Sequence, residues 1–188
     1  MERASGGGGG DVCSDEFPIC SVEPDGRELQ VVHKNQGDES ISEAIGDGVW
    51  FLVSGSRPQA EREFTVYFFD TDAGGVAHNL SYLRWIEAAR TDLAEAMGWG
   101  IGEMVGGEHG CPVLTKTEVE YLIPARLGEK VKVISRLGEV GKVRFWVESE
   151  VVGKKGELFC RAKQELVSVD LKTGKPKGLR EDWRKKHG

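Results

Sequence analysis

The chain has 188 residues, of which 39% are hydrophobic and 30% are charged, and its formal net charge is −6. These values are ordinary for a soluble globular protein, and the length is sufficient for one domain with a substantial core. No apolar run approaches the roughly 20 residues of a membrane-spanning helix, and the acidic N-terminus argues against a signal or transit peptide. The four cysteines are Cys13, Cys20, Cys111 and Cys160, and they lack CxxC spacing. Neither a zinc site nor a disulfide framework is therefore indicated, and the cytoplasm is the expected compartment.

The first 60 residues differ in composition from the rest. They contain four basic and eleven acidic residues, whereas the remainder is nearly balanced. They also include the five-glycine run Gly6–Gly10, which is typical of flexible coil. Short strands at Glu28–Val32 and Gly48–Val53 cannot build a core alone. We therefore predict that residues 1–60 are mostly a disordered extension and that the folded domain spans residues 61–178.

The domain is expected to open with a strand and one long helix. Phe64–Phe69 is rich in β-branched and aromatic residues and predicts a strand. An acidic segment and the turn Gly74-Gly75 follow. From Asn79 to Met97 apolar residues recur at helical spacing, and Gly98 supplies a stop signal. Asn79 or Ser81 is the expected N-cap, and Gly98–Gly110 is expected to be a loop.

Four further strands are predicted, and the links between them are short. Links with glycine, proline and charged residues favour antiparallel hairpins in a four-strand meander. The fold class is therefore α+β, an antiparallel sheet with one helix on its face. The four predicted strands are Val113–Leu122, Lys130–Leu137, Val143–Val152 and Leu158–Val169.

Residues 179–188 are expected to be a solvated basic tail. Few aromatic residues accompany the charges, so nucleic-acid binding is not predicted.

Asp72 follows the first strand and precedes the amino end of the helix. Helix starts carry unpaired N–H groups and a partial positive charge, which can hold an oxyanion. A nearby carboxylate can act as a nucleophile or as a base toward water. This arrangement suits chemistry at a carbonyl. Without further context, however, an Asp before two glycines is more often a turn former.

The chain resembles hotdog-fold acyl-CoA thioesterases of the 4-hydroxybenzoyl-CoA thioesterase type, including the Tol–Pal-associated branch. The resemblance implies a five-stranded antiparallel sheet wrapped around one long central helix, and hydrolysis of a thioester to a free acid and CoA. It implies no metal and no redox cofactor, and homodimers or homotetramers with active sites at the dimer interface. The resemblance covers roughly residues 61–178 and rests on Asp70–Val76, Tyr82–Trp85, Glu87–Thr91, Val119–Ala125, Val167–Asp170 and Thr173–Pro176.

In that family the catalytic acid is the second aspartate of the Asp-x-Asp pair, which is Asp72 here. The matching oxyanion donor is the backbone N–H of Asn79. The Tol–Pal-associated branch usually has an aromatic residue and a histidine where this chain has His78-Asn79, so a proton-transfer role for His78 is one alternative to its lining the pocket. The branch also has a tyrosine at the position of Phe68.

The remaining candidate residues surround this pair. Asp70 is expected to have a structural hydrogen-bonding role, because no His or Glu cluster completes a metal site. Glu87 is expected to form an ion pair with Arg84 or Arg90. Cys111 and Cys160 are expected to be small packed residues. Predicted substrate contacts are Gly75, Val76 and Tyr82, with Arg126 and Arg144 either near the CoA phosphates or simply surface charges.

Three functions are consistent with these observations. The first is an acyl-CoA thioesterase, and the second is a thioesterase that acts on acyl carrier protein. The third is a non-catalytic acyl-CoA-binding module. An acid beside the carbonyl site is unnecessary in a pure binder, so Asp72 favours an enzyme.

Overall fold

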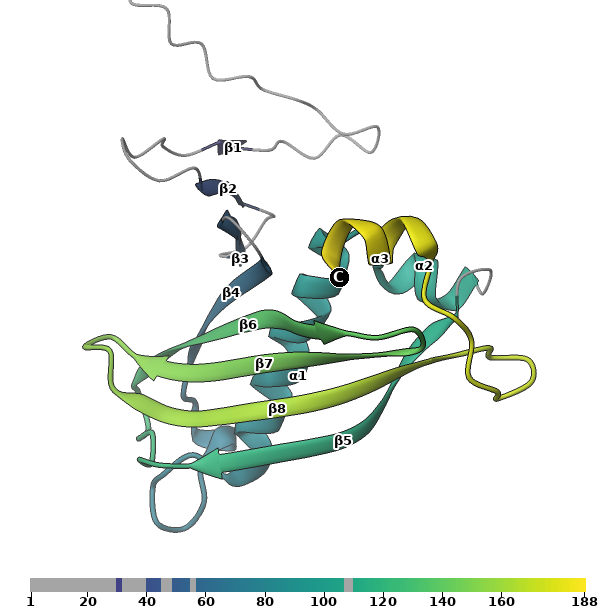
Figure 1. Ribbon diagram of the computed structural model, residues 1–188. Helices are drawn as coiled ribbons and strands as arrows, with labels where there is room; N and C mark the ends of the chain where they lie inside the picture. The colour runs from purple at the N-terminus through teal and green to yellow at the C-terminus, as the bar shows by residue number, and fades with distance from the viewer. Residues whose placement is uncertain (1–29, 32–39, 45–48, 55–56, 107–109) are drawn as a thin grey trace, which may run out of the picture.

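The computed structural model describes residues 30–31, 40–44, 49–54, 57–106 and 110–188 (Figure 1). The predicted disorder of residues 1–60 therefore falls largely outside the described residues. Within the described part of the chain, eight strands form one antiparallel sheet in the order β1-β2-β3-β4-β6-β7-β8-β5. The predicted α+β class is confirmed.

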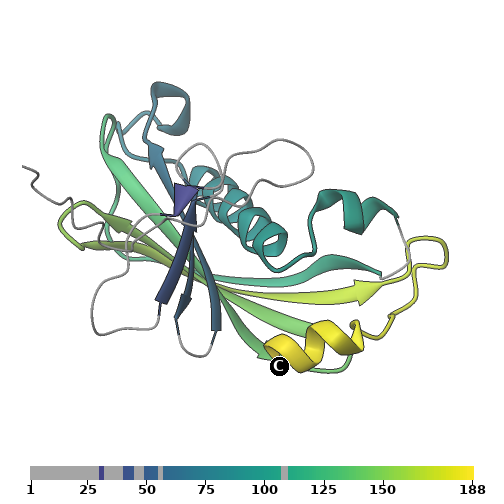
Figure 2. The same ribbon diagram turned by 90° about the horizontal axis from the view of Figure 1, so that it is seen from above.

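The long helix α1 (Asn79–Ala96) lies against one face of this sheet, as Figure 2 shows from above. The sheet positions the helix through its five main strands. They are β4 (Arg57–Thr65), β5 (Cys111–Tyr121), β6 (Lys130–Val140), β7 (Arg144–Gly153) and β8 (Leu158–Val169). Three short strands continue the sheet beyond β4: β1 (Gln30–Val31), β2 (Ser40–Ala44) and β3 (Val49–Ser54).

The first strand of the domain lies earlier than predicted. β4 begins at Arg57 and ends at Thr65, and Phe68–Asp70 form the short 3₁₀ helix η1 instead of continuing the strand. The carboxylate of Asp70 accepts the Tyr67 N–H at 3.0 Å, which turns the chain at this point. Tyr67, Phe68 and Phe69 are consequently exposed at the surface, and Phe68 is 82% exposed, whereas Phe64 remains in β4 and packs against the core.

The predicted four-strand meander is wrong in one connection. β5 pairs with β8 rather than with β6, and β6 pairs with β4. The link after β5 does not form a hairpin because Ala125 is tied to the start of α1: its carbonyl accepts the Ala77 N–H and its N–H donates to the Tyr82 hydroxyl, at 2.7 and 2.8 Å. The link from β5 to β6 therefore passes the start of α1. The β6–β7 and β7–β8 hairpins are confirmed.

Helix α1 buries one face in the core. Tyr82, Trp85, Ile86, Ala89 and Leu93 are all buried, and their spacing of three or four residues places them on the same side of the helix. The first four pack against inward-facing residues of the sheet, including Val131, Val133, Val151 and Phe159, and Leu93 packs in a second cluster with Leu137 and Leu166. The helix ends before Gly98, whose φ of 72° is readily adopted only by glycine.

The C-terminal residues are part of the core rather than a solvated tail. They form helix α3 (Glu181–His187), in which Trp183 is buried. Its ring lies against Trp99 and Phe145, with centroid distances of 5.4 and 5.6 Å. The expected loop Gly98–Gly110 contains the short helix α2 (Ile101–Gly106). Among the described residues, no helix has the length and apolarity to cross a membrane.

Cys160 is expected to be unreactive toward alkylating reagents in the folded protein. It is fully buried, and burial raises the pKa of its thiol to about 11, so little nucleophilic thiolate forms near neutral pH. Brief iodoacetamide treatment followed by peptide mass spectrometry should leave Cys160 unmodified in native protein and modify it in urea. Equal modification in both conditions would contradict its burial. Cys111, which is only partly buried, provides an internal comparison.

Candidate active site

Asp72 lies in a tight turn immediately before α1. Its N–H donates to the Val76 carbonyl at 2.9 Å, and the Gly75 N–H donates to the Asp72 carbonyl at 3.0 Å. Gly75 has a φ of 70°, which explains the glycine at this position. Oδ1 of Asp72 accepts the Gly74 N–H at 2.8 Å, and the side chain is exposed. Asp72 is therefore both a turn former and an accessible carboxylate; no described residue donates to Oδ2.

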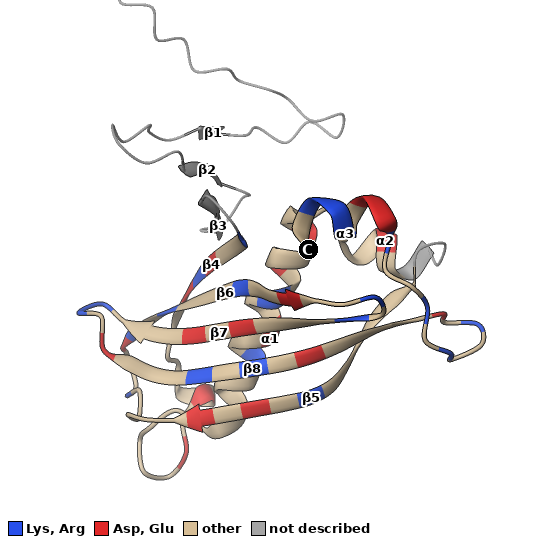
Figure 3. Ribbon diagram, in the orientation of Figure 1, with Lys and Arg blue, Asp and Glu red and all other residues tan. Residues whose placement is uncertain are grey.

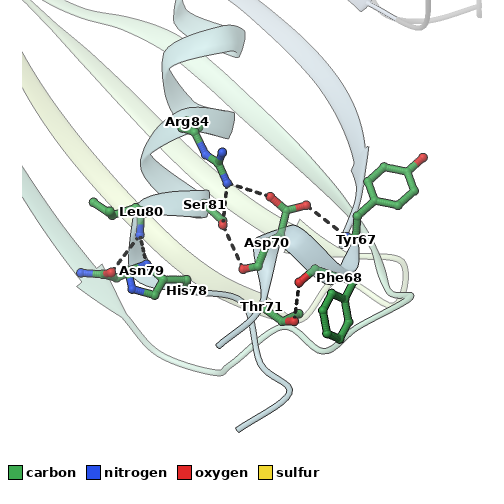
Figure 4. Close-up of polar contacts among 9 residues, drawn as sticks. All are labelled: Tyr67, Phe68, Asp70, Thr71, His78, Asn79, Leu80, Ser81 and Arg84. Carbon is green, nitrogen blue, oxygen red and sulfur yellow. Dashed lines mark hydrogen bonds and ion pairs between the residues drawn. The ribbon is translucent and has the colours of Figure 1, made fainter. Parts of the chain in front are cut away.

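Among the described residues, the start of α1 leaves one backbone donor open. The His78 N–H donates to the Asp70 carbonyl at 2.7 Å. The Leu80 N–H reaches two side-chain acceptors, His78 Nδ1 at 3.1 Å and Asn79 Oδ1 at 2.9 Å (Figure 4). The Ser81 N–H donates to the His78 carbonyl at 2.8 Å. Within the described residues, the Asn79 N–H has no acceptor, so it remains available to a bound oxygen.

His78, rather than Asn79 or Ser81, is the N-cap of α1. Its backbone is extended and its Nδ1 accepts from the Leu80 N–H. His78 is exposed beside the open N–H of Asn79. The capping role accounts for this histidine without requiring proton transfer.

A groove of about 570 Å³ lies beside the start of the helix. His78, Leu80 and Glu87 are part of its wall, with Phe69 and Thr71 from the preceding segment. Glu87 forms the predicted ion pair with Arg90. It also borders a second cavity of about 90 Å³, which is lined chiefly by apolar residues such as Met97, Trp99 and Leu166. The two hollows therefore follow α1 from its amino end toward its carboxyl end.

Asp70 has the structural role that was predicted. Its side chain is only 4% exposed, and it accepts hydrogen bonds from the Tyr67 N–H and from Arg84 Nη2, both at 3.0 Å. Its carbonyl accepts from the His78 N–H and from the Ser81 hydroxyl, at 2.7 and 2.9 Å. Asp70 thus joins η1 to the first turns of α1.

The structure places Gly75, Val76 and Arg126 next to the Asp72 turn. Val76 and Arg126 form an isolated antiparallel bridge, so the Arg126 side chain starts close to the candidate site. Tyr82, in contrast, is buried, and its hydroxyl is occupied by the Ala125 N–H. Burial raises the pKa of Tyr82, and the residue serves the core rather than the open groove.

Arg144 is not brought to this site. It lies at the other end of the sheet, because its neighbour Phe145 pairs with Val140 at the far end of β6. Ten residues of strand, roughly 30 Å, separate that end from Lys130. Arg144 instead forms an ion pair with Glu165 at 2.7 Å. Figure 3 shows basic and acidic residues on β6, β7, β8 and β5, and further ion pairs between these strands join Arg136 to Glu150, Arg161 to Glu120 and Lys163 to Glu148.

Two contributors were missed in the sequence. Arg84 contacts Asp70 and Ser81, and the only available signal was its spacing of three residues from Ser81 on one helix. The Tyr121 hydroxyl donates to the Asn79 carbonyl at 3.3 Å across 42 residues of sequence, a contact without a local signal. Among the described residues, no group of three His, Cys, Asp or Glu side chains is arranged to hold a metal ion.

Comparisons with known proteins identify the family of the chain. The profile of the thioesterase-like superfamily matches residues 66–186. The chain is 30% identical over 114 residues to the acyl-CoA thioester hydrolase YbgC of Escherichia coli O157:H7, which covers 61% of this chain and 84% of that protein. It is 26% identical over 111 residues to the acyl-CoA thioesterase YbgC of Haemophilus influenzae, which covers 59% of this chain and 81% of that protein.

Solved structures share the fold. The DHNA-CoA thioesterase from Staphylococcus aureus superimposes with a TM-score of 0.62 at 27% identity, over 68% of this chain and 87% of that one. The 1,4-dihydroxy-2-naphthoyl-CoA thioesterase from Synechocystis has a TM-score of 0.61 at 20% identity, over 67% of this chain and 93% of that one. Both similarities support the predicted hotdog architecture.

Proposed function

Because the chain belongs to the thioesterase-like superfamily, we propose that it hydrolyses an acyl-CoA thioester to the free acid and CoA. The observation that carries this proposal is the Asn79 N–H at the start of α1, which has no acceptor among the described residues, beside the turn that exposes Asp72. A donor for an oxyanion and a carboxylate at the same end of a helix are the two groups that acyl transfer requires.

In the proposed reaction the thioester carbonyl oxygen accepts a hydrogen bond from the Asn79 N–H. The positive end of the α1 dipole stabilises the negative charge that develops on this oxygen. Asp72 then either attacks the carbonyl carbon or removes a proton from an attacking water. The carbon–sulfur bond breaks, the CoA thiolate leaves and is protonated, and hydrolysis releases the acid. Arg126, which has no described ion-pair partner, is the nearest of the predicted cations for the CoA phosphates. The cysteine spacing supports a cytoplasmic site of action.

A substrate panel tests this proposal. Thiol release would be measured for short, long and aromatic acyl-CoA thioesters and for an acyl carrier protein thioester. We expect turnover of at least one acyl-CoA, and its loss in Asp72→Asn. Binding of acyl-CoA without turnover would favour a non-catalytic module, and turnover restricted to the carrier-protein thioester would replace CoA as the substrate carrier.

We also propose that the protein is a homodimer formed through β5. This strand is at the end of the described sheet, and Val113, Leu114, Tyr121, Leu122 and Ile123 in and after it are 39–49% exposed. An open strand edge flanked by apolar side chains suits pairing with a second copy.

Light scattering is expected to give twice the chain mass of 20.6 kDa. Leu114→Lys should shift the protein toward monomer, because it introduces a charge at the proposed interface. Leu171→Lys, at an exposed apolar residue outside β5, should leave the mass unchanged. A monomeric parent protein, or equal effects of both substitutions, would contradict an interface at β5.

A further inference from the structure

We propose that Arg84 and Asp70 act as a positioning pair that keeps the Asn79 N–H open at the start of α1. This inference rests on the proposed thioesterase function. Neither residue is assigned a contact with the substrate. Their role is to fix the backbone that carries the oxyanion donor.

The pair forms a closed set of contacts with Ser81. Arg84 Nη2 donates to Asp70 Oδ1 at 3.0 Å and to the Ser81 hydroxyl at 3.1 Å. The Ser81 hydroxyl in turn donates to the Asp70 carbonyl at 2.9 Å. Figure 4 shows the three side chains between η1 and the second turn of α1. The two segments are thereby held in one relative position.

The Asp70 carbonyl is the group that selects the donor. It accepts the His78 N–H at 2.7 Å and so removes this N–H from competition. The next open N–H along the helix is that of Asn79, because the N–H groups of Leu80 and Ser81 are already paired. If Asp70 shifts, the His78 N–H is freed and the direction of the Asn79 N–H changes with it.

Arg84 is the member of the pair to substitute, because Asp70 is buried and depends on its charge. The Asp70 side chain is 4% exposed, whereas that of Arg84 is 62% exposed. Removing the guanidinium leaves a buried carboxylate without its cation, which favours movement of Asp70 toward solvent. The exposed guanidinium also leaves room for a small soluble cation to take its place. This property allows a test by chemical rescue.

Arg84→Met is expected to lower kcat by about 10- to 100-fold with little change in KM, since a misdirected oxyanion donor retains part of the 100- to 1,000-fold effect of a complete donor. Millimolar guanidinium chloride should restore part of the lost kcat. The matched control is Arg62→Met, which removes the arginine of another Arg–Asp pair, to Asp92 on α1 at 3.0 Å, away from the helix start. This control should keep its kcat and show no response to guanidinium.

The two proposals fail in different ways. If the parent protein hydrolyses no thioester in the panel, the proposed function is wrong. If the parent protein is active and Arg84→Met keeps its kcat, the positioning role is wrong. It is also wrong if Arg84→Met loses only thermal stability or only substrate affinity, or if guanidinium leaves its kcat unchanged. Circular dichroism at the assay temperature separates loss of kcat from loss of fold.

Discussion

Asp72→Asn is expected to lower kcat by about 100- to 10,000-fold, the range typical for loss of a catalytic acid or base. The physical reason is that an amide nitrogen or oxygen neither attacks a thioester nor takes a proton from water at neutral pH. The fold should persist, because the Asn side-chain oxygen can still accept the Gly74 N–H that Oδ1 of Asp72 accepts now. Steady-state thiol release and a thermal melt would measure the two effects.

Asp170→Asn is the matched control. Asp170 is also an aspartate in a turn, where its Oδ1 accepts the N–H groups of Lys172 and Thr173 at 3.0 and 2.8 Å. It lies after β8 and outside the groove, so the same chemical change there should leave kcat intact. Full activity in Asp72→Asn would reject Asp72 as the catalytic acid. An equal loss in both variants would point to a general effect on folding.

The predictable part of the fold follows from local patterns. The helical spacing of Ile86, Ala89 and Leu93 predicts the buried face of α1, and alternation along β6 and β7 predicts strands with one face in the core. The place of β5 could not be predicted in this way. Its pairing with β8 depends on the Ala125 contacts that carry the link across the helix start, and these join residues more than 40 positions apart.

The candidate site shows the same division. The turn and the acid are visible in the sequence because Gly75 and Asp72 have local backbone roles. The choice of the Asn79 N–H depends on which neighbouring N–H groups are already paired. The His78 N–H donates to the carbonyl of Asp70, eight residues earlier, and the Leu80 N–H donates to the ring nitrogen of His78. A residue pattern does not record these pairings.

The C-terminal helix is where charge composition gave the wrong expectation. Seven basic residues between Lys172 and Gly188 suggest a solvated tail, yet a single aromatic residue decides the structure. Trp183 is 4% exposed and packs with Trp99 and Phe145, while the charged residues of α3 around it are exposed or partly exposed. Burial of one large ring therefore outweighs the solvation preference of its neighbours.

Trp183→Ala is expected to lower the free energy of unfolding by about 3–5 kcal/mol, the cost typical of removing a buried aromatic ring. The control is Trp146→Ala on β7, because Trp146 is only partly buried, faces away from α1 and contacts Lys163. Its removal leaves no closed cavity, so the loss should be clearly smaller. Urea unfolding followed by circular dichroism measures both values, and similar losses would contradict the packing of α3.

Trp183→Phe separates the packing of the ring from its polar atom. The indole nitrogen of Trp183 is buried and has no hydrogen-bond partner among the described residues, so phenylalanine keeps most of the apolar contact and removes an unsatisfied donor. We expect a loss below about 1.5 kcal/mol, as in swaps that keep most of the volume. A loss as large as that of Trp183→Ala would contradict the expectation that most of the apolar contact is kept. Trp99 contacts Trp183 and also lines the small cavity beside α1. We therefore expect hydrolysis to be unchanged in a Trp183 variant that leaves Trp99 in place.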